Sequence, residues 1–419
     1  MPTHPTRSHR PIEILHLAYT RFPADTRVKR EIAVLQTTGR RVAVVALRGA
    51  GERSVEHRDG VVIIRVRGRK SRGGALSYVT EYAAFVWRCR RLLVRHRALK
   101  DLQVVHVHTL PDFLLWAALP AQRRGTRVVF DMHEIFPEFT ASRFRGPVGA
   151  IVTRLALLIE RWARRRADLT ITVNRLTDEV LAARPIARPE RRIVIHNTAD
   201  PADFGGATSP PAVGHQLELV YHGTLTTLYG LDVAIRAVVQ LRREGRDVRI
   251  SILGDGPQRA SLGELAAELD VRNAVVFEPA IPQRALPARL RRCAAGVVPT
   301  RLDGMTRYSL STKLLEYVHL GIPVLAARLP SYLRYFDERA LWYWKPADPA
   351  DLARAIREFA SASPDERTDR TRRAREAIAP FGWAQEQQEL LLAYGELLAR
   401  GANRSASTLA IRSAARPSP

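Results

Sequence analysis

Short apolar runs alternate with longer amphipathic stretches along the first half of the chain. The runs have the length of buried strands and occupy residues 12–18, 41–47, 61–66, 103–107, 127–131, 169–173 and 193–196. Residues 28–36 and 75–99 repeat apolar positions at helical spacing, which is typical of a helix that packs one face on a core. Strands that alternate with helices predict a parallel, doubly wound sheet.

This alternation stops at residues 200–215 and then starts again. The segment DPADFGGATSPPAVGH carries the glycines and prolines that are typical of a linker. Strands are expected next at residues 217–221, 248–253, 275–277, 296–299 and 323–326, with helices at residues 230–244 and 259–269. A last amphipathic helix is expected at residues 381–399, before a tail without acidic residues that is expected to be disordered.

The pattern predicts an α/β fold with two Rossmann-like, doubly wound parallel-sheet domains that face each other across a cleft. A chain of 419 residues also exceeds what one compact core usually holds. The expected divisions are residues 1–200, 201–380, a C-terminal helix at 381–400 and the tail at 401–419. Neither half contains GxGxxG, which argues against a nicotinamide cofactor.

The net charge of +24 comes mainly from the first half of the chain. Residues 1–200 contain 37 Lys and Arg against 18 Asp and Glu, whereas residues 201–419 contain 29 against 24. Such asymmetry favours an anionic partner, such as a membrane surface or a phosphorylated acceptor, although an arginine-rich coding bias gives the same count. A nucleic-acid partner is not expected, because no known binding motif or interleaved aromatic residues accompany the charge.

The composition is that of a globular protein. Its two cysteines, Cys89 and Cys293, have no metal-like spacing and are expected to be reduced thiols. The apolar run at residues 12–18 is too short for a signal sequence, and no stretch has the length of a membrane span. We therefore expect a cytoplasmic protein, either soluble or peripheral at the inner face of the cell membrane.

The stretch YSLSTKLLEYVHLGIPVLA, residues 308–326, combines a helix start with groups that suit phosphate. Its hydroxyl residues at the helix start are Ser309, Ser311 and Thr312. Free N–H groups at a helix start attract phosphate oxygens, and Lys313 adds a positive charge there. Glu316, one turn on, can accept from a ribose or sugar hydroxyl. The alternative is a capped helix whose Lys313 and Glu316 form a surface ion pair.

Two strands of the second half end in tight glycine turns. Gly223 and Thr224 follow one strand in YHGTLTTLYGLD, and Gly254 follows the next strand in LGDGP. Glycine lets the backbone approach a ligand closely, and Thr224 adds a hydroxyl. Each turn alone also suits a plain strand-to-helix connection. Both turns and residues 308–326 are nevertheless expected at one edge of the same sheet.

Polar residues also follow the strands of the first half. The loop and helix start RFPADTRVKRE could hold an anionic acceptor, or form a solvated helix start, through Arg21, Asp25, Arg27 and Arg30. HVHT and DMHEIFPE place His108, His133 and Glu134 at or just beyond neighbouring strand ends, which suggests a polar site. A zinc site is not expected, because the spacing fits no familiar ligand pattern.

The ordered set of motifs resembles GT-B-fold glycosyltransferases of family 4, a retaining group that uses nucleotide sugars. The resemblance runs nearly end to end, through FPADTRVKRE, DMHEIFPEF, HGTLTTLYGLD, LGDGP and STKLLEYVHLGIPVLA. The closing FGWAQEQQELLLAY is similar to the last helix of the family, which packs back on the first domain.

The resemblance implies a nucleoside-diphosphate sugar in the second domain. Glu316 matches the family glutamate that contacts the ribose, and His133 matches the histidine that reaches the donor sugar. The candidate catalytic residues are His133, Lys313 and Glu316. Acceptor contacts are expected from Arg21, Asp25, Arg27, Arg30, His108 and Glu134. No metal or other cofactor is implied, because the departing diphosphate takes the acceptor proton in such enzymes.

Three positions depart from the family pattern. Tyr308 stands where the first of two glutamates is usual, while Thr224 and Tyr229 stand where arginine and lysine are usual. We expect Lys313, with Arg301 or Arg307, to replace the missing positive charge. The donor-binding candidates are then Gly223, Thr224, Gly254, Arg301, Tyr308, Ser309, Ser311, Thr312, Lys313 and Glu316.

The sequence therefore predicts a retaining glycosyltransferase that acts on a glycan or lipid-linked acceptor in cell-surface glycan biosynthesis. The basic amphipathic stretches at residues 75–99 and 150–166 are expected to dock on anionic lipid. Two other functions stay open, a nucleotide-sugar epimerase on the same fold and a catalytically idle nucleotide-sugar-binding module.

Overall fold

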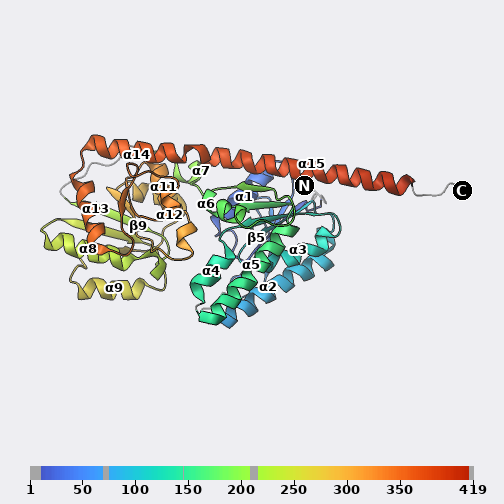
Figure 1. Cartoon of the computed structure of the whole chain (residues 1–419), viewed down its shortest axis with the longest axis horizontal. Coiled ribbons are helices and arrows are strands. Elements are labelled where there is room, and N and C mark those ends of the chain that lie inside the picture. Colours follow the sequence, from blue (N-terminus) through green and yellow to red (C-terminus); the bar gives the residue numbers. More distant parts are fainter. Residues whose placement is uncertain (1–10, 69–74, 145, 208–215, 415–419) are drawn as a thin grey trace, which may run out of the picture. The chain divides into compact units, whose positions relative to one another are not determined.

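The computed structural model describes residues 11–68, 75–144, 146–207 and 216–414. The chain divides into unit 1, Met1–Ile195 with Glu386–Pro419, and unit 2, His196–Gln385. Each unit has one parallel or largely parallel sheet with helices on both faces (Figure 1), which confirms the predicted fold class. The predicted division at residue 200 lies close to the division between the units.

Unit 1 is built on an eight-stranded sheet with the order β3-β4-β2-β1-β5-β6-β7-β8. Its strands are β1 (Ile14–Ala18), β2 (Val42–Leu47), β3 (Val55–Arg58), β4 (Val61–Val66), β5 (Val104–His108), β6 (Arg127–Met132), β7 (Leu169–Thr172) and β8 (Arg192–Val194). Only the edge pair β3 and β4 is antiparallel among these strands. Strand β3 was not among the expected strands, because VEHR has no apolar run and its side chains are largely exposed.

Helices cover both faces of this sheet. They are α1 (Thr26–Gln36), α2 (Ala75–Arg95), α3 (Leu115–Gln122), α4 (Phe136–Arg143), α5 (Gly146–Arg166), α6 (Arg175–Ala182) and α15 (Trp383–Ala414), with short 3₁₀ turns η1 (Arg97–Leu99) and η2 (Asp112–Leu114). Helices α2, α3 and α5 lie side by side on one face, and α1 and α15 lie on the other (Figure 1). Successive side chains of β1 and β5 point to opposite faces of the sheet. On the face covered by α2 and α3, the apolar core contains Leu15, Leu17, Val105 and Val107.

Helix α15 corrects one expectation from the sequence. The predicted disorder of residues 401–419 is wrong as far as Ala414, because the helix continues to that residue. Residues 415–419 lie outside the described residues. The stretch from 402 to 414 contains no glycine or proline, so each added residue extends an existing helix at little cost. Leu390, Ala393 and Leu397 of α15 are buried in unit 1.

Unit 2 is built on a six-stranded, all-parallel sheet with the order β11-β10-β9-β12-β13-β14. The strands are β9 (Leu217–His222), β10 (Val248–Leu253), β11 (Val275–Glu278), β12 (Ala295–Val298), β13 (Val324–Ala327) and β14 (Trp342–Trp344). The helices are α7 (Pro201–Phe204), α8 (Leu231–Arg243), α9 (Arg259–Glu268), α10 (Leu286–Leu290), α11 (Thr312–Leu320), α12 (Pro330–Leu333), α13 (Pro349–Ser361) and α14 (Pro364–Ile378). The short 3₁₀ turns are η3 (Thr227–Tyr229), η4 (Gln283–Ala285), η5 (Thr306–Tyr308) and η6 (Ala379–Phe381).

Strand register brings the candidate residues of each unit to one sheet edge. In unit 1, Ala18 pairs with His108, which in turn pairs with Asp131. In unit 2, His222 pairs with Leu253, so the glycines that follow these two residues are neighbours. The carboxyl ends of parallel strands are where α/β proteins bind ligands.

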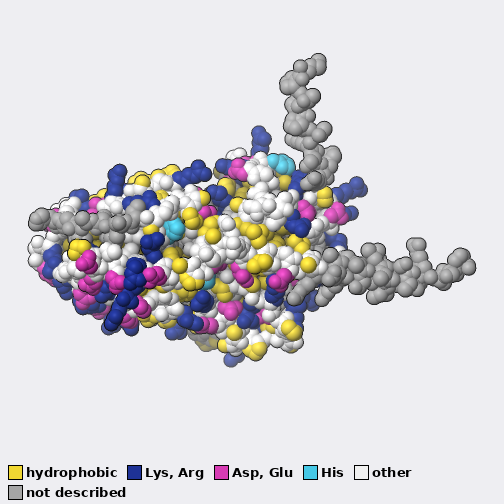
Figure 2. Space-filling model, turned by 90° about the horizontal axis from the view of Figure 1, so that it is seen from above, with side chains coloured by type: hydrophobic (Ala, Val, Ile, Leu, Met, Phe, Trp, Pro, Cys, Tyr) yellow, Lys and Arg dark blue, Asp and Glu magenta, His cyan; other side chains and the backbone are white. Residues whose placement is uncertain are grey.

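Three further facts concern the described residues. On the face seen in Figure 2, Lys and Arg side chains lie among Asp and Glu side chains over the described residues. Among the described helices, none is both long and apolar enough to cross a bilayer. Cys89 and Cys293 are buried free thiols.

Candidate active site

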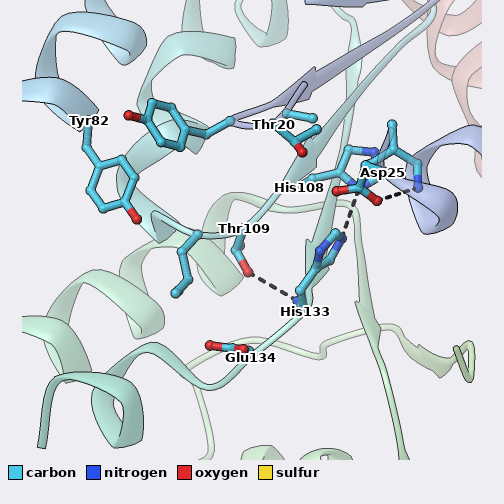
Figure 3. A pocket seen from close by; sticks show the side chains of 11 residues that line it. Thr20, Asp25, Tyr82, His108, Thr109, His133 and Glu134 are labelled. Atoms are coloured by element: carbon cyan, nitrogen blue, oxygen red, sulfur yellow. Dashed lines mark hydrogen bonds between the residues drawn. The ribbon is translucent and has the colours of Figure 1, made fainter. Parts of the chain in front are cut away.

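A cavity of about 370 Å³ opens at the carboxyl ends of β1, β5 and β6 (Figure 3). The polar side chains that line it are Tyr19, Thr20, Asp25, Tyr82, His108, Thr109, His133 and Glu134. Three of the acceptor candidates, Asp25, His108 and Glu134, therefore share one cavity with His133. The sequence places these residues in three separate segments, and the parallel register brings them together.

His133 is held in this cavity at two points. Its backbone N–H donates to Thr109 Oγ1 at 3.2 Å, and its ring Nε2 lies 3.0 Å from Asp131 Oδ2. Burial alone would lower the pKa of His133, but the charge of Asp131 and its hydrogen bond outweigh burial and raise that pKa. The imidazole therefore retains a proton at higher pH than a free histidine does.

Asp131 is the anion around which these side chains are arranged. It is completely buried, and Arg27 donates to it from Nη2 to Oδ1 at 2.8 Å and from Nε to Oδ2 at 3.1 Å. His108 Nδ1 lies 3.0 Å from Oδ2 as well. Burial opposes ionisation, but Arg27 and the histidines outweigh it and hold the pKa of Asp131 well below its usual range.

The structure corrects the expected role of Arg27. Its guanidinium is buried, bonds Asp131 and the carbonyl of Ile195 (2.8 Å), and lies 3.1 Å from Glu31. It is committed to the interior of unit 1 and is not offered to an acceptor. Burial lowers the pKa of Arg27, but the two carboxylates raise it by more, so that the residue stays charged.

The other candidates from the same loop lie closer to solvent. Asp25 caps α1 by accepting from the backbone N–H of Val28 at 3.2 Å, and it also lines the cavity. Arg21 is exposed, and Arg30 is half-buried. Of the expected acceptor residues in this loop, only Asp25 is thus a lining residue of the described cavity.

A cluster of buried histidines lies behind the cavity, and sequence reasoning missed most of it. His16 Nδ1 lies 2.8 Å from His108 Nε2, and His106 Nδ1 lies 2.7 Å from the hydroxyl oxygen of Tyr394 on α15. The rings of His106 and His108 stack at 4.3 Å. Burial lowers the pKa of both His16 and His108, so these rings are neutral. The signal for His106 was present, because residues two apart in a strand share a face.

The same cluster contains the groups that could hold a metal ion. Ligand atoms of His16, Glu31, His106 and His108 lie within 4.8 Å of one another, and so do those of His108, Asp131 and His133. Arg27 already supplies a positive charge to both carboxylates of this cluster. The expectation that no metal is needed stays a prediction.

In unit 2, the two strand-end glycines and Lys313 are in direct contact. A side chain at Gly254 (φ +139°) would collide with the carbonyl of Gly223, and one at Gly223 (φ +120°) would collide with Lys313. Only glycine fits this close approach, because L side chains rarely adopt such backbone angles. The turns that the sequence singled out therefore form one surface with the start of α11.

Lys313 is the buried cation of this surface. Its Nζ lies 3.8 Å from the ring centroid of Tyr229 and 5.4 Å from that of Tyr221. Burial lowers its pKa to about 8, partly opposed by Glu316. The alternative of a surface ion pair is wrong for Lys313, because its side chain is only 8% exposed. The amine thus reaches over Tyr229, where the family pattern has a lysine of its own.

Glu316, on the same helix, faces a histidine that the sequence did not single out. Glu316 Oε2 lies 3.2 Å from Nε2 of His222, the last residue of β9. Burial, with Lys313 nearby, lowers the pKa of His222 to about 3, so His222 is neutral. His222 immediately precedes Gly223, and this position at a strand end was the available signal.

The remaining donor candidates surround this surface without all touching it. Arg301 Nη2 donates to Asp232 at 2.6 Å, and its backbone is bonded to the loop that contains Gly230. Thr224 is exposed, and its carbonyl accepts from the Tyr221 hydroxyl at 2.8 Å. The residues before and at the start of α11 are Tyr308, Ser309, Ser311 and Thr312, all half-buried or exposed.

Comparison with known proteins identifies the family. Residues 24–198 match the family described as "Glycosyl transferase 4-like domain", and residues 209–377 match "Glycosyl transferases group 1". Together the two matches cover most of both units. The chain belongs to the GT-B glycosyltransferases of the family-4-like kind.

Individual relatives of this glycosyltransferase are distant. The 2-deoxystreptamine glucosyltransferase of Streptomyces kanamyceticus is 29% identical over 262 residues, which is 58% of this chain. This chain spans less than two thirds of the first curated relatives it matches, 63% in this case.

Solved structures share the fold. Sucrose-phosphate synthase from Thermosynechococcus elongatus has a TM-score of 0.74 at 16% identity, covering 93% of this chain and 99% of that one. Anabaena Alr3699/HepE in complex with UDP-glucose has a TM-score of 0.68 at 17% identity, covering 92% and 99%.

Proposed function

We propose that this protein transfers a sugar, with retention of configuration, from a nucleoside-diphosphate sugar to a glycan or lipid-linked acceptor in cell-surface glycan biosynthesis. Unit 2 holds the donor, and the cavity of unit 1 holds the reacting part of the acceptor. The observation that carries the proposal is the buried amine of Lys313 beside Gly223 and Gly254 at the strand ends of unit 2.

The chemistry of the donor fits this surface. A nucleoside diphosphate carries negative charge on its phosphates and a vicinal diol on its ribose. Lys313 and the free N–H groups at the start of α11 suit the phosphates, and Glu316 suits a hydroxyl donor such as the ribose. Stabilising the charge of the departing diphosphate is the main demand of this reaction, because it loosens the bond to the sugar.

A thermal-shift screen with UDP-, GDP- and ADP-sugars tests donor binding. A ligand that binds only the folded protein raises its melting temperature, and Lys313→Met or Glu316→Ala should abolish the rise. The exposed Glu264→Ala on α9 is the matched control and should retain the full rise. If no nucleotide sugar stabilises the unaltered protein, the donor assignment is wrong.

In unit 1, we assign His133 to the donor sugar and the reacting hydroxyl of the acceptor. Its raised pKa suits a donor of hydrogen bonds to sugar or phosphate oxygens near neutral pH. Nuclear magnetic resonance of the product distinguishes retention from inversion at the anomeric carbon. The inverted anomer would contradict the retaining mechanism.

The acceptor side also offers a surface for anionic lipid. On α5, Val148, Ile151, Leu155 and Leu158 recur at helical spacing and are each more than half exposed. Trp87 of α2 and Trp116 of α3 are exposed as well, and helices α2, α3 and α5 cover the same face of the sheet (Figure 1). Arginines of α2 accompany them, such as Arg90, which lies 4.0 Å over the Trp116 ring. An apolar face edged with cations is typical of a helix surface that lies on a membrane.

Co-sedimentation with vesicles tests this docking. The protein should bind phosphatidylglycerol vesicles and lose most of that binding on Leu155→Ser with Leu158→Ser. Exposed Leu392→Ser on α15 is a control that should change nothing. Equal binding to neutral phosphatidylcholine vesicles would overturn the electrostatic part of the proposal.

Product analysis separates the transferase from the two other functions. An epimerase releases an altered sugar without an acceptor, whereas a binding module shows donor binding and no turnover. The position of Lys313 over Tyr229 favours a competent donor site, since it supplies a cation where the family lysine is missing.

A further inference from the structure

A second cavity of unit 1 lies beside the one that contains His133. It measures about 670 Å³ and is formed by the residues that follow β2 and β4, together with one face of α2. Its arginines are Arg48, Arg67 and Arg88, and we call it the three-arginine cavity. Like the His133 cavity, it lies at the carboxyl edge of the sheet, where α/β domains bind ligands.

The two cavities share a wall. The Tyr19 hydroxyl, which belongs to the His133 cavity, donates to Glu81 Oε2 of the three-arginine cavity at 3.2 Å. Tyr82 lines the first cavity, and its neighbour Glu81 lines the second. The backbone N–H of Leu47 donates to the carbonyl of Thr20 at 2.8 Å. This hydrogen bond connects the end of β2 with the loop that follows β1. One extended ligand can therefore reach both cavities across this wall.

The lining of the three-arginine cavity is strongly positive. Among the described residues, three arginines line it against one carboxylate, Glu81. The Glu52 carboxylate also lies at this cavity, because it accepts from the N–H of the lining residue Gly49 at 2.5 Å, but Arg65 offsets its charge from 3.1 Å. A surplus of positive charge of this size complements a phosphate or diphosphate group.

The arginines keep donors available for a ligand. Arg48 Nε donates to the carbonyl of Glu52 at 2.7 Å, and Arg88 Nη1 donates to the carbonyl of Arg67 at 2.5 Å. Each guanidinium has five N–H groups, so one such bond positions the side chain without using its binding capacity. Arg67 is exposed. Three glycines also line the cavity, namely Gly49, Gly51 and Gly68. The N–H of Gly49 is taken by Glu52, whereas Gly51 has open space around it and lets a phosphate approach the backbone.

We propose that the three-arginine cavity binds a phosphate or diphosphate group of the acceptor while the reacting hydroxyl of the acceptor lies in the His133 cavity. This inference rests on the proposed transfer function and adds the chemical class of the acceptor. It also assigns the negative charge of the acceptor to different arginines. Arg27 is buried, and the arginines that follow β2 and β4, with the one on α2, take its place.

Helix α2 favours a lipid-linked phosphate as the source. Thr80, Ala84 and Arg88 face the cavity at helical spacing. The adjacent positions Val79 and Trp87 on α2 are more than half exposed. A phosphate held by Arg88 would leave an attached hydrocarbon chain beside this apolar stripe, whereas a free sugar phosphate gains nothing from it.

Calorimetric titration of the full chain tests the cavity directly. The probes are geranyl diphosphate and glucose 6-phosphate, each compared with its uncharged parent, geraniol or glucose. Both phosphates should bind more tightly than their parents, and geranyl diphosphate most tightly. Arg48→Ala with Arg67→Ala should weaken phosphate binding by about tenfold or more, because charged hydrogen bonds are lost. Exposed Arg53→Ala is the matched control and should leave binding unchanged.

Each outcome decides a stated part of the proposal. Equal phosphate binding in the double variant, or no advantage of phosphate over the uncharged parent, overturns the cavity assignment. Tighter binding of glucose 6-phosphate than of geranyl diphosphate overturns the lipid-linked source. Nucleotide-sugar stabilisation should persist in the double variant, since the donor surface belongs to unit 2. If the unaltered protein lacks that stabilisation, the transfer function fails even where the phosphate probes bind.

Discussion

At the scale of single residues, Asp131 shows how unit 1 tolerates charge in its interior. One carboxylate oxygen lies about 3 Å from the ring nitrogens of both His108 and His133 and from Arg27 Nε. A buried carboxylate is costly unless such partners compensate it. The arrangement fixes the ring of His133 in the cavity. Asp131, which is buried, therefore positions His133, which we expect to contact the ligand.

Removing Arg27 should therefore destabilise unit 1 strongly. Arg27→Ala leaves Asp131 and Glu31 buried without their cation, and we expect a loss of about 3–5 kcal/mol in the free energy of unfolding. The matched control is Arg40→Ala, because Arg40 and Glu13 form a pair with side chains 30% and 25% exposed. That control should cost about 0–1 kcal/mol. Urea unfolding measures both, and similar losses would contradict the buried-pair interpretation.

The pKa of Lys313 predicts a pH dependence of donor binding. The pKa is lowered to about 8, so the amine is charged below pH 8 and loses its proton as the pH rises through that value. Nucleoside diphosphate should bind with a dissociation constant that rises by up to about tenfold per pH unit above pH 8, because binding then requires proton uptake. Titrations at pH 7, 8 and 9 measure the slope. Lys313→Met should bind weakly at every pH, and a slope that persists in this variant would assign the effect to another group.

The site residues that could be predicted from the sequence are those that directly follow an apolar run. His133, Gly223 and Gly254 follow directly after strands, and the pattern of strands therefore exposed them. His16 and Glu31 lie within a buried strand and a helix, and Tyr394 lies 288 residues from the His106 that it contacts. No local spacing joins such residues, since only the strand order and α15 bring them together.

At the scale of elements, the strand-end turns of unit 2 depend on backbone angles that only glycine tolerates. We expect Gly254→Ala to abolish nucleotide-sugar stabilisation, because the added methyl would push the Gly223 carbonyl out of place beside Lys313. Gly245→Ala is the matched control, with a positive φ of +79° but open space around the site of the added methyl. It should lower stability modestly and preserve donor binding. Equal loss of binding in both variants would show that strain alone is responsible.

Most elements were predictable for the reason that the sheets are parallel. Strands covered on both faces are continuous apolar runs, which are easy to recognise. Of the two strands that were missed, β3 lacks this signal because it is an exposed antiparallel edge. Strand β14 carries the signal, since its three residues are apolar and buried, and it was overlooked. The end of α15 was misjudged because a lack of acidic residues says little about helix propensity.

At the scale of the whole molecule, two sheets divide the chemistry between them. The His133 cavity and the three-arginine cavity lie in unit 1, which also carries the larger share of the net charge, while the glycine turns and Lys313 lie in unit 2. The fold and family followed from the order of motifs along the chain. The phosphate-binding arginines that we propose did not, because no motif marks them and only the tertiary structure gathers them.

The division of the units has a consequence for synthesis on the ribosome. Unit 1 is discontinuous in sequence, and its last part, from Glu386 onward, emerges only after all of unit 2. Until then Tyr394 cannot reach His106, and Leu390, Ala393 and Leu397 cannot cover their face of the sheet. Until then the nascent first sheet has an uncovered apolar surface, a state that favours chaperone binding. The first unit to be made is thus the last to be completed.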